Sequence, residues 1–211
     1  MSRCKEPRNI IKVLKTSRSQ GFIDGVFCAA ALHRLSTLNS RSRDGPCDVV
    51  ELFEAWTVCL DEASRNLETF GAQELAIAAL AVAKSRPRHE RSKDLFHQIL
   101  DRVLPGLHLN SRPLPMRYVS NLLWAAANLR SSADVLFEEV LVTLQQRTHG
   151  ACNARDAAQL CWAFATQKHP KALEMLESLA VDQHAKLASY SDHDLATTIW
   201  AVANMTCPKP A

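Results

Sequence analysis

Cysteine and histidine, the residue types that most often bind metals or carry redox chemistry, are present but not grouped as such sites require. The seven cysteines lack the short spacing of a zinc or redox pair; they lie at positions 4, 28, 47, 59, 152, 161 and 207. His149 and Cys152 are three residues apart, but one pair cannot complete a zinc site. We therefore expect no metal and no cofactor. The odd count indicates a reducing compartment, with Cys28 and Cys161 among the buried structural thiols.

The sequence also contains no motif of a known catalytic site. It has no phosphate-binding glycine-rich loop, no metalloprotease pair of histidines and no nucleophile elbow. The triplet Asp192-His193-Asp194 contains residue types that catalytic sites use. It lies at the start of a predicted helix, however, and the helix N-terminus favours both carboxylates. We therefore expect a protein that is not an enzyme. No apolar run approaches the length of a transmembrane helix, so we expect no membrane insertion.

Positive charge is concentrated at the N-terminal end. Residues 1–43 hold nine lysines and arginines against two acids, although the whole chain carries a net charge of only +3. This basic end could meet a polyanion, but such arms also occur on proteins that bind nothing charged. The first twenty residues weakly resemble an organellar transit peptide. We prefer the alternative that Asn9–Ser17 forms the first helix, because its apolar residues lie on one side.

A tryptophan followed by small residues recurs along the chain. Trp124, Trp162 and Trp200 are each 38 residues apart, within the segments 121–129, 159–167 and 197–205. Two earlier segments, 77–85 and 27–35, fit the same pattern with Leu80 and Ala30 at the tryptophan position. In four of the five copies an acid lies six residues before this position, where it favours a helix start; these are Asp24, Glu74, Asp156 and Asp194.

Amphipathic segments between these copies complete a repeating helix pair. They are predicted at Val49–Leu67, Lys93–Leu104, Ala133–Arg147 and Pro170–Leu187, and the prolines between 105 and 115 are read as a loop. A single pair cannot bury its apolar faces, so the pairs must stack. The sequence thus predicts an all-α fold, an α-solenoid of about five helix pairs with a period near 38 residues. Residues 1–21 form a basic helix or arm, and residues 22–211 form the array, with its last repeat incomplete.

The first helix of each pair has one narrow polar side. At about 100° per residue, positions −7, −3 and +4 from the tryptophan fall within roughly 40° of each other. The other positions, the tryptophan position included, are mostly apolar and are expected to be covered. We call the polar side chains at the three positions the polar ribbon; they are Arg34, Gln73, Lys84, Arg117, Asn121, Asn128, Arg155, Gln159, Thr166, His193, Thr197 and Asn204.

The polar ribbon should line the concave groove of the stack and offer donors and acceptors to the base edges of single-stranded RNA. The alternative is that it is the solvated strip that every solenoid must have. A second RNA-binding surface is predicted on the basic segment 84–93, at Arg86, Arg88, Arg91 and Lys93. Against RNA, the ribbon almost lacks aromatic side chains that could stack on bases. A solenoid could also bind peptides, so a protein–protein scaffold stays open.

The run Ala30-Ala-Leu-His-Arg-Leu35 and the Trp-Ala-x-Ala helices that follow closely resemble organellar helical-repeat proteins. These are the octotricopeptide and heptatricopeptide repeat families and the FAST-kinase-like and RAP-domain proteins. The similarity extends from about Phe22 to Met205 and covers no RAP domain. The resemblance implies a mitochondrial or plastid protein that binds organellar transcripts or ribosomal RNA. With about five units, it favours a subunit or factor of a larger ribonucleoprotein, such as an organellar ribosome.

The last copy of the repeat predicts an interface. Ile199, Trp200 and Val202 occupy positions that earlier copies cover, and a row of exposed apolar residues usually marks a contact surface. We therefore expect the C-terminal face around Trp200 to dock onto another protein or RNA. The alternative is that the array continues.

Overall fold

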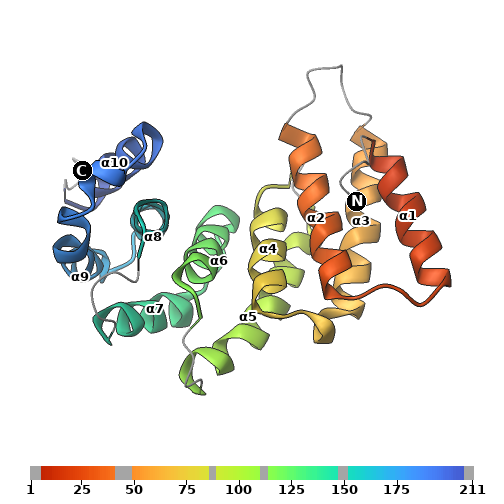
Figure 1. The fold of residues 1–211 in the computed structure, drawn as a ribbon, viewed down its shortest axis with the longest axis horizontal. Helices are drawn as coiled ribbons and strands as arrows, with labels where there is room; N and C mark the ends of the chain where they lie inside the picture. The colour runs from red at the N-terminus through yellow and green to blue at the C-terminus, as the bar shows by residue number, and fades with distance from the viewer. Residues whose placement is uncertain (1–5, 41–48, 86–88, 110–113, 147–151, 207–211) are drawn as a thin grey trace. The chain divides into compact units, whose positions relative to one another are not determined.

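The computed structural model describes residues 6–40, 49–85, 89–109, 114–146 and 152–206. Within these ranges the chain forms ten α-helices and no strand, which confirms the all-α prediction (Figure 1). Short 3₁₀ turns at Leu67–Thr69 and Leu187–Ser189 precede the fourth and the tenth helix. The α-helices in chain order are α1 (Pro7–Ser19), α2 (Gly25–Ser40), α3 (Val49–Arg65), α4 (Ala72–Ala83), α5 (Arg91–Leu109), α6 (Met116–Leu129), α7 (Asp134–Gln146), α8 (Ala154–Gln167), α9 (Ala172–His184) and α10 (Asp192–Thr206).

The chain divides into two compact units, Met1–Pro105 and Gly106–Ala211. The sequence placed a loop at this boundary, but α5 continues through Pro105 to Leu109. Likewise, Pro170 was expected in the first turn of a helix, yet α9 begins two residues later, at Ala172. Both differences concern helix ends, where local signals are least decisive.

In the first unit α1 packs against α3, and α2 packs against both α3 and α4. The expected N-terminal helix is therefore present as α1, and it buries Ile10 and Leu14. Gly25 at the start of α2 lies close to Phe70, which precedes α4, because a Cβ there would lie 2.7 Å from the Phe70 Cα. Glycine is thus required at this contact for its lack of a side chain.

In the second unit α8 packs against both α6 and α10, while α7 packs against α9. The helices of this unit therefore form two rows, one of α6, α8 and α10 and the other of α7 and α9. Each helix contacts the next helix of its own row, as in an α-solenoid. The residue after the tryptophan position is a buried alanine in every copy; these alanines are Ala31, Ala81, Ala125, Ala163 and Ala201. A small side chain there lets neighbouring helix axes approach closely.

The ends of α6 and α8 are built alike. Arg130 and Lys168 follow these helices with φ of 50° and 53°, the left-handed conformation that closes many helices. The amide of Gln167 on α8 donates to the carbonyl oxygens of Ala126 (3.3 Å) and Ser131 (3.2 Å) at the end of α6. One side chain therefore ties the two helix ends together.

The helix starts use the predicted acids in different ways. Asp24 caps α2 by accepting the N–H of Phe27 at 2.8 Å. At α10 the Ser191 hydroxyl accepts the N–H of Asp194 at 3.2 Å and donates to the Asp194 carboxylate at 2.6 Å. At α8 the cap is Asn153, which accepts the N–H of Asp156, while Asp156 itself is buried.

The four cysteines in the described ranges, Cys28, Cys59, Cys152 and Cys161, are all buried free thiols. Burial raises the pKa of both Cys28 and Cys161 to about 12, so both stay protonated at neutral pH. The prediction that Cys28 and Cys161 are buried is therefore confirmed.

Candidate functional site

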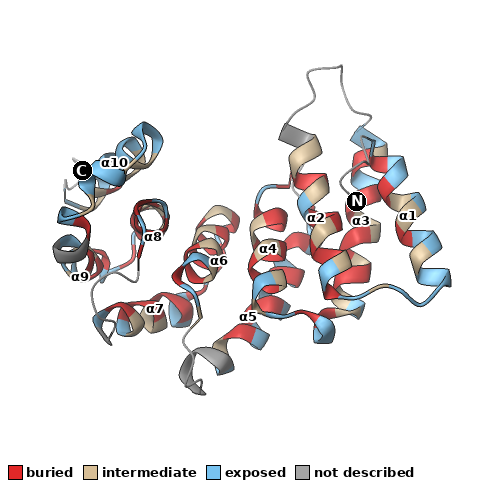
Figure 2. Cartoon of the chain, viewed as in Figure 1, coloured by how far each residue is buried: buried red, intermediate tan, exposed pale blue. Residues whose placement is uncertain are grey.

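Most residues of α6 and α8 are buried (Figure 2). The accessible ones, except Tyr118 and Gln167, fall within about 60° of each other on the helical wheel, and we call this side of the two helices the strip. The accessible side chains of α6 are Arg117, Tyr118, Asn121, Trp124 and Asn128, and those of α8 are Arg155, Gln159, Trp162, Thr166 and Gln167. Every ribbon residue predicted on these two helices is in this strip. The physical reason is the helix period, which brings positions −7, −3 and +4 to the same side.

The strip differs from the predicted ribbon at the tryptophan position. Trp124 and Trp162 are half-buried rather than covered. Their rings stack on each other between the two helices, with centroids 5.7 Å apart and planes 27° from parallel. On the helical wheel the tryptophan position adjoins the ribbon, so the half-buried indoles extend the strip. The ribbon positions of α6 and α8 hold no aromatic residue, as the sequence indicated, and the aromatic rings come from the tryptophan position beside them.

A buried polar contact fixes α6 against α8 beside the strip. Ser120 of α6 donates to Asp156 Oδ1 at 3.1 Å, and it lies 3.2 Å from Gln159 Oε1 of α8. Burial raises the pKa of Asp156, and the Ser120 hydrogen bond and the charges of Arg155 and Arg117 oppose this. Arg117 and Arg155 are exposed, so this end of the strip presents two cations to solvent.

The remaining ribbon positions of this unit are less uniform. The Thr166 hydroxyl is buried and makes no hydrogen bond within the described residues, so it cannot meet a base edge in this conformation. Asn128 is half-buried. On α10, Thr197 donates to the His193 carbonyl at 2.8 Å, and Asn204 donates to the Trp200 carbonyl at 2.8 Å.

The first unit carries a shorter part of the ribbon. Gln73 and Lys84, at the two ends of α4, are exposed, and Arg34 on α2 is half-buried. On the same side of α4 the accessible residues between them are the apolar Ile77 and Leu80, whereas the accessible Glu74 lies about 120° from Leu80 on the helical wheel. The strip on α4 is therefore less polar than those on α6 and α8.

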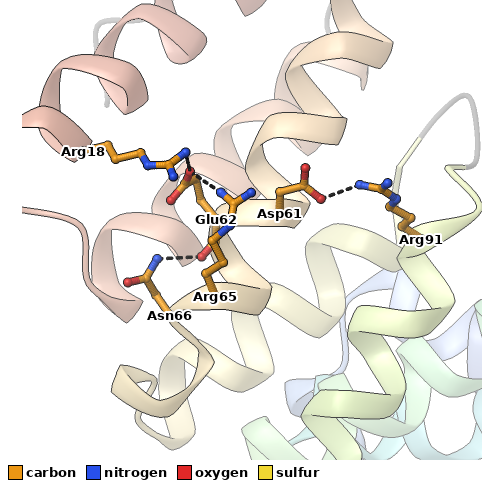
Figure 3. Close-up of polar contacts among 6 residues, drawn as sticks. All are labelled: Arg18, Asp61, Glu62, Arg65, Asn66 and Arg91. Atoms are coloured by element: carbon orange, nitrogen blue, oxygen red, sulfur yellow. Dashed lines mark hydrogen bonds and ion pairs between the residues drawn. The ribbon is translucent and has the colours of Figure 1, made fainter.

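The predicted basic surface is only partly described. Arg86 and Arg88 lie outside the described residues. Arg91 forms an ion pair with Asp61 of α3 at 2.5 Å (Figure 3). Lys93 is exposed. The charge of Arg91 is thus balanced locally, which weakens it as a phosphate-binding group.

Part of the N-terminal positive charge holds α1 against α3. Arg18 pairs with the buried carboxylate of Glu62 at 3.0 Å, and Arg65 pairs with the same carboxylate at 2.7 Å (Figure 3). Arg8 pairs with Glu51. These contacts show a structural use for cations that the sequence suggested for a polyanion.

No group of three or more acids, histidines and cysteines in the described ranges is placed to hold a metal ion. His149, one member of the weak candidate pair, lies outside those ranges. Among the described helices, none combines the length and apolar character needed to span a bilayer. No family model, curated protein or solved structure matches this chain.

Proposed function

We propose that this chain is a non-catalytic RNA-binding helical-repeat protein that acts in organellar gene expression. The observation that carries the proposal is the accessible strip of α6 and α8. Both helices bury nearly every other side chain, yet both keep an arginine and an amide in the same positions: Arg117 and Asn121 on α6, Arg155 and Gln159 on α8. Arginines bind phosphates, and amides pair with base edges.

The repeat itself supports a strip that continues from helix to helix. In the second unit α6, α8 and α10 begin at Met116, Ala154 and Asp192, and each start follows the previous one by 38 residues. We propose an α-solenoid of about five such helix pairs. In this arrangement each pair would contribute one set of ribbon residues, and hence one contact along an RNA strand.

The proposed place of action is the mitochondrion, with the plastid as the alternative. It is supported by the resemblance to organellar repeat families. A ribonucleoprotein subunit, for example of the organellar ribosome, fits a short array, because neighbouring subunits would supply the rest of the RNA contacts. Localisation of a fluorescent fusion tests the place of action. Crosslinking in cells and sequencing of attached RNA tests membership of a ribonucleoprotein, and attachment to no RNA would contradict it.

A binding experiment tests the strip directly. We expect the double variant Arg117→Gln, Arg155→Gln to bind a single-stranded RNA more weakly than the wild type. Each lost phosphate contact should reduce the slope of log affinity against log salt by about 0.7. The matched control is Arg130→Asn, Lys168→Asn, which removes the same charge from the other end of the same helices, and asparagine tolerates the left-handed conformation. Equal effects of the two double variants would contradict a role for the strip.

A protein–protein scaffold is the second candidate, and the side face of α10 favours it. Leu195 is 42% and Ile199 61% exposed, while the matching residues of α8, Ala157 and Cys161, are buried. Because α10 packs against α8, we propose that a helix of a partner protein covers this face of α10 as α10 itself covers α8. Replacing Leu195 and Ile199 with serine should then release a bound protein while leaving RNA affinity unchanged.

A further inference from the structure

The tryptophan position is the part of the strip that the repeat pattern alone does not explain. An indole that only filled the core would be expected at a covered position, as Trp56 of α3 is, with 0% exposure. Trp124 and Trp162 are instead half-buried, although their neighbours Leu123 and Ala163 are 0% exposed. The neighbouring apolar residues are thus fully covered, while both indoles stay partly accessible.

The surroundings of the indoles are polar. Asn121 and Gln159 lie three residues before the two tryptophans, roughly one helical turn away. Arg117 and Arg155 lie seven residues before, roughly 10 Å along the helix axis. Each helix therefore presents a cation, an amide and an indole in the same order, and the two stacked rings join the two sets.

The combination of arginine, amide and indole side chains favours one class of ligand for the strip over another. A protein helix that covered the indoles would also cover the amide of Asn121 and the Nε2 group of Gln159, whose Oε1 already accepts from Ser120, and an apolar cover would leave these groups unsatisfied. A single-stranded nucleic acid suits all three groups, since phosphates meet arginines, base edges meet amides and base faces meet aromatic rings. Positive charge at one end of the strip complements the phosphate backbone.

We infer that Trp124 and Trp162 form a stacking surface for the bases of a single-stranded RNA that lies along the strip. Trp200 of α10, which is 46% exposed at the same position of the repeat, extends this surface by one helix. The inference rests on the proposed function and adds the side chains that hold the bases. It gives the tryptophans a role in binding besides their packing against each other.

The test measures the affinity of the whole chain for a twelve-nucleotide oligouridine over a range of salt. Trp124→Leu and Trp162→Leu keep an apolar side chain but remove the indole, and each should weaken binding about tenfold. The salt slope should stay that of the wild type, because stacking neutralises no phosphate. Trp162→Phe keeps an aromatic face and should lose less affinity than Trp162→Leu.

A second measurement uses the wild-type chain and does not depend on how the variants fold. Oligouridine carrying 5-iodouridine, which crosslinks on irradiation to aromatic side chains stacked on it, should attach to the peptides of Trp124 or Trp162. Crosslinks found only elsewhere, unchanged affinity of folded leucine variants, or a salt slope that falls with affinity would each overturn the stacking surface and leave the arginine-dependent RNA binding standing. No binding of wild type to oligouridine or to mixed-sequence RNA at low salt would overturn the proposed function itself.

Discussion

The carboxylate of Glu62 should fix the N-terminal helix to the first unit. Its side chain is 7% exposed and pairs with Arg18 of α1 and Arg65 of α3, whose side chains are 62% and 52% exposed (Figure 3). A hydrogen bond to a charged group contributes about 1.5–3 kcal/mol when buried, and an exposed ion pair about 0–1 kcal/mol. Because the carboxylate is buried and the guanidinium groups are in water, Glu62→Gln should lower the free energy of unfolding by about 1–2 kcal/mol.

The loss should appear mainly in α1, because only the Arg18 contact joins two helices. Urea denaturation followed by circular dichroism gives the total, and hydrogen exchange of Pro7–Ser19 amides reports the docking of α1. The matched control is Glu54→Gln, which changes an exposed glutamate of the same helix. A double-mutant cycle with Arg18→Gln should give a larger coupling than one with Arg65→Gln, a pair within one helix. If Glu62→Gln were as stable as Glu54→Gln with unchanged exchange in α1, the reasoning would fail.

Three further predictions concern buried side chains. Asp156→Asn should be at least as stable as wild type at neutral pH. Burial raises the pKa of Asp156 in the folded state, so the wild type loses stability relative to the variant as pH rises above about 4, which urea midpoints between about pH 4 and 7 would reveal. Cys28 and Cys161 should react with iodoacetamide at about pH 8 only after denaturation, since their thiols are buried with pKa values of about 12; mass spectrometry that found either alkylated in native protein would contradict this. Phe164→Ala should cost about 3–5 kcal/mol, because Phe164 is 0% exposed and packs edge-on against Phe137 at 4.9 Å; a loss below about 1 kcal/mol would show that its site collapses freely.

Local sequence patterns were sufficient to predict the all-α fold and the position of most helices. Helical periodicity and helix-start residues act within a few positions of the chain, so they can be recognised in a single sequence. The predicted segment Ala133–Arg147 corresponds to α7 (Asp134–Gln146) for this reason. The same logic failed at Pro105, because helix α5 tolerates a proline that a local rule reads as its end.

The polar ribbon on α6 and α8 was also predictable, since a helical wheel requires only a period and a reference residue. Which wheel positions a neighbouring helix covers is not a local property. Trp124 and Trp162 were assigned to the core by their apolar character, and only the packing of α6 against α8 places them half-buried and stacked at the edge of the strip. The Thr166 hydroxyl is also buried, although the wheel put it among the polar side chains.

The sequence by itself therefore determined which residues share a side of each helix, and the tertiary structure decided which of them solvent reaches. The physical reason is the range of the interactions. Periodicity and capping are set by backbone hydrogen bonds over one or two turns. The pairing of Arg18 with Glu62, 44 residues apart, depends instead on how α1 docks on α3, and that is decided by burial across the whole unit.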